Sequence, residues 1–154
     1  MSAAITGATF PLEFYEDING ERVKITFRAS PLADIDLVEL DIWVQSRYIR
    51  TARIAARDLP QEERDREIDI AQQRASTMSA FSGQGARMIA TIDGMSQVVL
   101  QSVRRNHPDI TAERLRYLLT NPANLAEAND IFHRANAGQA VKKTAGAKSK
   151  KARR

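Results

Sequence analysis

The sequence predicts a mainly α-helical protein with α+β character at its N-terminus: a β-hairpin over residues 10–28, about five helices, and a disordered basic C-terminal tail. Three observations lead to this prediction. Apolar and polar residues alternate on either side of an Asn-Gly pair near the N-terminus. Apolar residues then recur every three or four positions through most of the chain. The last 17 residues carry seven cations, no acid and no apolar face.

The hairpin prediction depends on two alternating segments and the turn between them. The first alternates Phe10, Leu12 and Phe14 with other residues, and the second alternates Val23, Ile25 and Phe27 with polar ones. Asn19-Gly20 lies between them, and Asn-Gly is the strongest short signal for a two-residue hairpin turn. Because an isolated hairpin is marginal in water, we expect its apolar face to pack on the helices or on another chain.

A long helix is expected to follow, with Ser30 as its N-cap and Pro31 at its first position. This helix carries two apolar rows, which together predict a wide buried face. One row comprises Ile35, Val38, Ile42 and Ile49, and the other comprises Leu37, Leu40, Val44 and Tyr48. Acids occupy its first half and arginines its second, an order that complements the helix dipole.

Proline and glycine divide the rest of the chain. Asp58-Leu59-Pro60 ends the first helix and starts a second, whose early acids would face the arginines of the first helix if the two fold back antiparallel. A flexible joint over 82–85 precedes a third helix, in which Gly94 would allow a close approach by another helix. This helix is expected to run through Arg104-Arg105-Asn106 and stop at His107-Pro108.

Two further helices complete the expected body. Thr111 or Asp109 can cap a short fourth helix with Leu115, Leu118 and Leu119 inward. Asn121-Pro122 starts a fifth helix, whose inward positions are Leu125, Ala128, Phe132 and Ala135. The predicted organisation is therefore a single helical domain over 1–137 and a disordered tail over 138–154.

Composition restricts the classes of function. The chain has no cysteine, which excludes disulfides and thiolate metal sites. No apolar run approaches the roughly 20 residues of a membrane span, and the N-terminus does not resemble a signal peptide. Removing the seven tail cations from the 23 basic residues leaves 16 against 19 acids, so the body is weakly acidic and the tail accounts for the net charge of +4.

No candidate for catalysis withstands comparison with a structural interpretation. His107 and His133 lack metal-pair spacing, and His107 is better explained as a cap of the third helix. The acids near Glu62 fit a solvated helix face better than a cation site. Gly83-Gln84-Gly85 lacks the strand and lysine of a phosphate-binding loop. We therefore expect a non-enzymatic protein without catalytic, cofactor-binding or metal-binding residues.

Nucleic-acid binding has two candidate sources. Arg114 and Arg116 follow a helix-turn-helix-like corner, but the proline linker and Glu113 favour ordinary packing. The tail is the stronger candidate, because clustered cations bind phosphates without sequence preference; a merely solubilising tail fits equally well. Its basic residues are Lys142, Lys143, Lys148, Lys150, Lys151, Arg153 and Arg154.

Two stretches resemble the tail assembly chaperones of long-tailed bacteriophages. The first is Val23–Val44, a short basic strand leading through a proline-containing turn into an acidic, leucine-rich helix with a tryptophan. The second is Leu100–Leu119, centred on Arg104–Thr111. Their order and spacing, and the chain length, are similar to that family, although Val98–Val103 replaces its usual aromatic or leucine-rich residues.

The resemblance implies a holdase that acts in the host cytoplasm during phage assembly. It would bind apolar helical segments of the tape measure protein and help recruit tail tube subunits; homo-oligomerisation stays open, and no membrane is involved. We expect the client to contact the first and third helices, although core packing explains most of the same residues. These are Ile42, Val44, Met88, Ile92, Met95 and Val99. The alternatives are a structural virion component, such as a connector or minor tail protein, and a nucleic-acid-associated protein.

Overall fold

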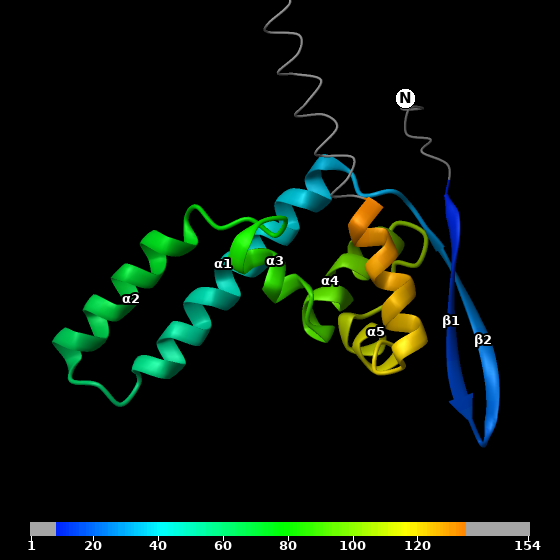
Figure 1. The fold of residues 1–154 in the computed structure, drawn as a ribbon, viewed down its shortest axis with the longest axis horizontal. Helices are drawn as coiled ribbons and strands as arrows, with labels where there is room; N and C mark the ends of the chain where they lie inside the picture. The colour runs from blue at the N-terminus through cyan, green and yellow to red at the C-terminus, as the bar shows by residue number, and fades with distance from the viewer. Residues whose placement is uncertain (1–8, 135–154) are drawn as a thin grey trace, which may run out of the picture. The chain divides into compact units, whose positions relative to one another are not determined.

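The computed structural model describes residues 9–134 (Figure 1). Within this range, a two-stranded antiparallel hairpin precedes six helices, which confirms the mainly α fold with an N-terminal hairpin. The elements are β1 (Phe10–Ile18), β2 (Glu21–Ala29), α1 (Asp34–Ala56), α2 (Gln61–Ala75), α3 (Gly83–Ile89), α4 (Ile92–Val103), α5 (Ala112–Leu118) and a helix over 122–134. Ala135 and the predicted tail lie outside the described residues.

The chain comprises two compact units. One unit combines the described parts of Met1–Leu32 and Met95–Arg154, and the other is Ala33–Gly94. The first therefore holds the hairpin and the C-terminal helices, and the second holds α1, α2 and α3.

The hairpin turns at the expected residues. Asn19 and Gly20 have φ of 52° and 83°, and the register closes on the pair Ile18 and Glu21. Positive φ at both turn residues is what a type I′ turn requires, and it matches the right-handed twist of the strands. One face is buried near the open end of the hairpin, through Leu12, Phe14, Phe27 and Ala29. Ile18 and Val23, near the turn, are exposed.

Side chains from the C-terminal segment bind both outer edges of the hairpin. In an antiparallel hairpin with a two-residue turn, the residue pair next to the turn exchanges backbone hydrogen bonds, and every second pair after it does the same. Tyr15 and Arg28 belong to the pairs in between, so their backbone N–H and C=O groups face outward. The Asn124 amide accepts from Tyr15 N–H and donates to Tyr15 C=O, each at 2.8 Å. On β2, Arg28 N–H donates to His107 Nε2 at 2.8 Å, and Asn106 Nδ2 donates to Arg28 C=O at 3.1 Å.

Helix α1 begins at Asp34, so the prediction of a start at Ser30-Pro31 was wrong. Ser30 is held instead by Ser102: its N–H donates to Ser102 C=O, and its C=O accepts from Ser102 Oγ, both at 2.7 Å. The helix starts after Ala33, whose N–H donates to Asp36 Oδ2 at 2.8 Å. A contact with a residue 72 positions away therefore overrides the local Ser-Pro signal.

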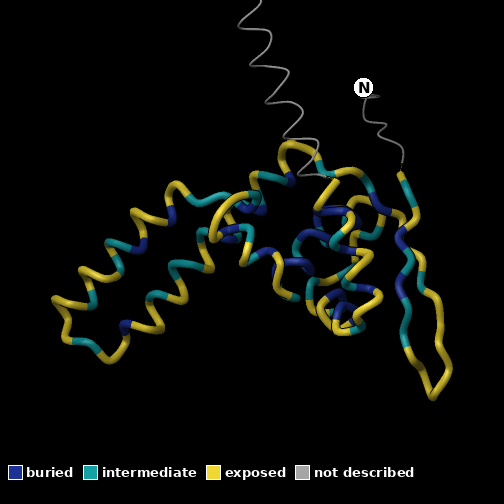
Figure 2. Tube along the Cα trace, viewed as in Figure 1, coloured by how far each residue is buried: buried dark blue, intermediate teal, exposed yellow. Residues whose placement is uncertain are grey.

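Helices α1 and α2 form an antiparallel hairpin, and the predicted break at Asp58–Pro60 lies in the loop that connects them (Figures 1 and 2). Ala56 of α1 and Ala71 and Ala75 of α2 are buried. Within the described residues, the arginines that end α1 form no ion pair with the acids of α2, contrary to expectation; Arg57 instead contacts its neighbour Asp58. Small apolar side chains therefore join the two helices.

The single third helix expected after residue 85 is divided into α3 and α4. Thr91 ends one and starts the other: its hydroxyl donates to Met88 C=O at 2.6 Å and accepts from Gly94 N–H at 3.1 Å. The backbone turns so sharply that a Cβ on Gly94 would lie 2.4 Å from Ile89 Cα. Gly94 therefore permits a close approach, but by the preceding residues Met88 and Ile89 and not by a separate helix packing on the predicted one. Gly85, expected in a flexible joint, is instead buried within α3.

At the corner before α5, the predicted N-cap is correct, but the preceding helix ends earlier than predicted. Helix α4 ends at Val103, four positions before His107. The backbone N–H groups of Asn106 and His107 both donate to Val103 C=O. Thr111 is the N-cap of α5, with Oγ1 accepting from Arg114 N–H. Asn121 caps the last helix through Ala123 N–H at 3.0 Å. Leu115, Leu118, Leu119, Ala128 and Phe132 are buried, as predicted.

Candidate functional site

The strongest candidate for a functional surface is an exposed apolar row on α1. Ile35, Val38 and Ile42 lie on one side of the helix, at the spacing of successive turns, and are 56%, 50% and 50% exposed. The opposite side is buried through Asp36, Leu40 and Val44. The sequence assigns both apolar rows to one buried face, and for the first three members of this row that assignment was wrong.

Ile35 and Val38 lie on the part of α1 that extends beyond α2. Helix α1 has 23 residues and α2 has 15, so α1 extends about 12 Å further. The segment that follows α2 lies beside Gln45, because Gln45 Nε2 donates to Met78 C=O at 3.0 Å. Ile49, beside α2, is partly buried, whereas the three row residues before Gln45 are exposed. We call Ile35, Val38 and Ile42 the α1 row.

Only part of the client-binding set proposed from sequence is accessible. Ile42 is half exposed, and Met88 and Ile92 are partly buried. Val44, Met95 and Val99 have no exposed surface and belong to the core, the alternative that the sequence left open. The six residues therefore do not form one exposed surface. Sequence reasoning missed Ile35 and Val38 as surface residues, since periodicity does not distinguish an uncovered apolar row from a covered one.

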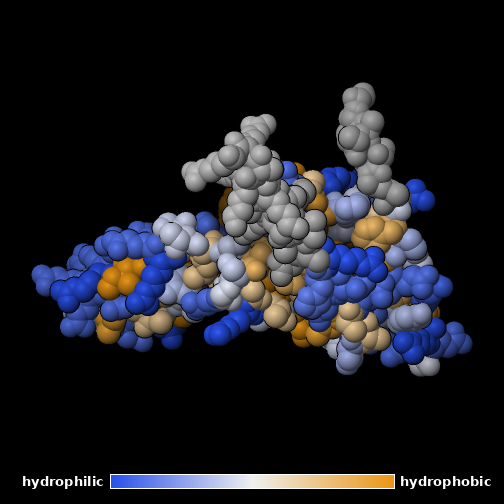
Figure 3. Space-filling view, turned by 45° about the horizontal axis from the view of Figure 1, so that its top comes forward, coloured by the Kyte–Doolittle hydropathy of each residue, from blue (hydrophilic) through white to orange (hydrophobic). Residues whose placement is uncertain are grey.

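The surface around the α1–α2 hairpin is otherwise strongly polar. Figure 3 shows mostly hydrophilic side chains over this hairpin, with an apolar patch enclosed by them. Exposed residues of α2 include Glu62, Glu63, Asp65, Glu67 and Asp69, the acids noted in the sequence. Among the residues that the structure describes, no group of three or more histidine, aspartate or glutamate side chains is placed to hold a metal ion.

The two histidines have different environments. His107 Nε2 accepts from Arg28 N–H, and its ring lies edge-on to Phe27, with centroids 5.4 Å apart. The backbone N–H can only donate, so this nitrogen carries no proton when the bond forms. His107 thus joins the corner to β2 as a hydrogen-bond acceptor, rather than capping the end of a helix. His133 is exposed near the end of the described region.

The Arg114 guanidinium is engaged by a carboxylate. Its two terminal nitrogens bind the two oxygens of Glu16 at 2.8 and 2.5 Å. Hydrogen bonding by Arg114 lowers the pKa of the Glu16 carboxyl from its ordinary value, more than burial raises it. A bidentate pair of this kind joins β1 to α5. Glu16 is therefore fixed as an anion and does not serve as a proton donor at neutral pH.

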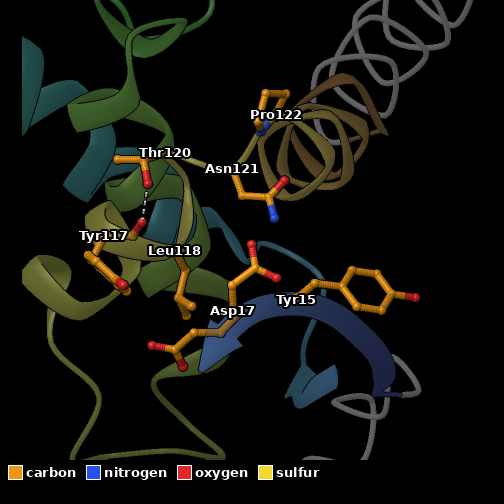
Figure 4. A pocket seen from close by; sticks show the side chains of 8 residues that line it. Tyr15, Asp17, Tyr117, Leu118, Thr120, Asn121 and Pro122 are labelled. Carbon is orange, nitrogen blue, oxygen red and sulfur yellow. Dashed lines mark hydrogen bonds between the residues drawn. The ribbon is translucent and has the colours of Figure 1, made fainter. Parts of the chain in front are cut away.

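A shallow cavity of about 380 Å³ lies beside this ion pair (Figure 4). Tyr15 and Asp17 of β1 contribute to one wall, and Tyr117, Thr120 and Asn121 contribute to the other. Figure 4 shows the Tyr15 ring pointing away from Tyr117, so the two rings do not enclose a planar ligand. The Thr120 hydroxyl is already bonded to Tyr117 C=O at 2.7 Å. This cavity carries no arrangement of groups specific to a ligand.

The structure bears on only one of the two phosphate-binding candidates. Helix α3, which contains Gly83-Gln84-Gly85, is only seven residues long, and Gly85 packs against Ser79 C=O. The basic cluster from Lys142 to Arg154 lies outside the described residues.

Comparison of the chain with models of known protein families, with curated proteins and with solved structures found no match. In the described region, none of the helices combines the length and apolarity needed to cross a membrane. The features that bear on function are the surfaces described above and the resemblance of the two short stretches.

Proposed function

We propose that this protein is a non-enzymatic tail assembly chaperone of a long-tailed bacteriophage. It acts in the host cytoplasm, binds apolar helical segments of the tape measure protein and helps recruit tail tube subunits. The observation that carries this proposal is the exposed α1 row, because half-exposed apolar side chains at helical spacing suit an apolar helix laid alongside. The row lies within Val23–Val44, the first stretch that resembles the family.

The arrangement of the two resembling stretches also supports the proposal. Arg28 belongs to the first stretch, and Asn106 and His107 belong to the second. These residues bind each other through the edge of β2. Both stretches therefore contribute to one structural joint, which gives a physical reason for a shared order and spacing.

Co-expression with the tape measure protein tests the proposal. The chain should increase the soluble fraction of that protein, and replacing Val38 and Ile42 by serine should reduce the gain, because both side chains are exposed contributors to the α1 row. Ile54→Ser is the matched control, since Ile54 is 54% exposed on another side of α1. An unchanged soluble fraction with the wild-type chain would contradict the chaperone function.

Mass spectrometry of purified virions separates the proposal from a structural role. A chaperone should be absent or scarce in finished particles. Abundance in virions would instead favour a connector or minor tail protein.

A further inference from the structure

The α1 row lies in the first half of α1, which is acidic. The second half of the helix is basic. Asp34 and Glu39 lie in the first part of α1, and Arg50 and Arg53 lie in the second. Asp41 and Arg47 are engaged within the chain, by Ala80 N–H and by the Asp93 carboxylate respectively. Glu39 and Arg53 fall on the same side of the helix as the α1 row. This helix therefore has an apolar strip and an ordered change of charge sign along its length.

We propose that the α1 row is covered by the α1 helix of a second copy of this chain, running antiparallel. A two-fold axis between Ile42 and Gln45 would place Val38 against the partner's Ile49 and Glu39 beside the partner's Arg53. Antiparallel pairing sets the acidic half of each helix along the basic half of the other, whereas parallel pairing sets like charges together. The surface is thus self-complementary, as an isologous dimer requires.

The lengths of α1 and α2 agree with this occupant. Because α2 leaves the first part of α1 uncovered, a second α1 can lie there beside the end of α2. Each copy contributes the same three exposed apolar side chains, so pairing removes both rows from water together. The two helical hairpins would form a four-helix bundle across the axis.

The pairing does not depend on the proposed chaperone function. If both hold, a client helix and a second copy compete for the α1 row, and the dimer is the state of the chaperone without client. The dimer is measured on the purified chain alone and client binding by co-expression, so failure of either is recognised separately.

Sedimentation of the full chain over a concentration series tests the dimer directly. The wild-type chain should sediment as a reversible dimer, and Ile42→Ser should raise the dissociation constant at least about a hundredfold, because the burial of two apolar side chains near the axis, one from each copy, is lost. The control Ile54→Ser should leave it unchanged. A wild-type monomer at all concentrations, or equal effects of the two substitutions, would overturn the proposal.

Charge reversal tests the direction of pairing. Glu39→Arg and Arg53→Glu should each weaken the dimer, and the double variant should recover most of the wild-type affinity. Failure of the double variant to recover would reject the antiparallel register.

Cysteine crosslinking provides a second test of direction, since the chain contains no cysteine. Under mild oxidation, Ile42→Cys should form a covalent dimer, whereas Ile35→Cys should not, because Ile35 lies far from the axis in an antiparallel pair. Crosslinking at Ile35 that equals crosslinking at Ile42 would indicate a parallel pair and contradict the proposal. Circular dichroism confirms that each variant keeps its helical content.

Discussion

The imidazole Nε2 of His107 accepts a 2.8 Å hydrogen bond from the backbone N–H of Arg28, 79 residues earlier in the chain. This bond satisfies an outward-facing donor on the edge of β2, which an isolated hairpin would leave to solvent or to another chain. Asn124 does the same for Tyr15 on the edge of β1. The hairpin is thereby fixed to the C-terminal helices through its backbone as well as through its apolar face.

Replacing His107 by phenylalanine should therefore weaken the attachment of β2. The variant keeps an aromatic ring beside Phe27 but removes the acceptor for Arg28 N–H, so we expect a loss of about 1 kcal/mol in the free energy of unfolding. Urea denaturation measures this loss. Hydrogen exchange at the Arg28 amide should accelerate more than exchange in α2, and equal acceleration at both places would argue against a local role for His107.

Asn124→Ala should be more damaging than His107→Phe. The Asn124 side chain is completely buried and makes three hydrogen bonds, two to Tyr15 and one to Leu118 C=O. Its loss leaves several buried polar groups without a partner, at a cost of about 2–4 kcal/mol. Asn129→Ala on the same helix is the control and should cost under about 1 kcal/mol. Denaturation of both variants compares the costs; equal losses would show that Asn124 is not special.

The Glu16–Arg114 pair predicts a component of stability that depends on pH. Because Arg114 lowers the pKa of Glu16 in the folded state below its ordinary value of 4.5, the pair stabilises the fold above that pH. This contribution is lost as the pH falls through the lowered pKa. Denaturant midpoints should therefore fall more steeply below pH 4.5 in the wild-type chain than in Glu16→Gln. Parallel pH profiles for the two chains would contradict this assignment.

Gly94→Ala should destabilise the chain although alanine is the better helix former. The added Cβ would lie 2.4 Å from both Ile89 Cα and Met88 O, so backbone must move, at a cost of about 1–3 kcal/mol beyond the gain of about 1 kcal/mol in helix propensity. The control is Ser46→Ala, on the exposed part of α1, which should be neutral or slightly stabilising. Thermal unfolding of the two variants provides the comparison. A stabilising Gly94→Ala would show that the turn between α3 and α4 can relax.

Local chemistry by itself determined much of this fold. Asn19-Gly20 specifies the hairpin turn, Thr111 and Asn121-Pro122 start the last two helices, and Asp58–Pro60 separates α1 from α2. Each of these signals acts through dihedral preferences or hydrogen bonds within a few residues, so no knowledge of distant contacts is needed.

Tertiary structure alone decided where α1 begins and which of its apolar rows is covered. Ser102 holds Ser30 outside the helix, and Ile35, Val38 and Ile42 are exposed while Val44 is buried. The edge bonds of His107 and Asn124 likewise join residues about 80 to 110 positions apart. Periodicity records that a helix has apolar faces, but covering a face depends on partners that only the folded chain, or a second molecule, brings to it.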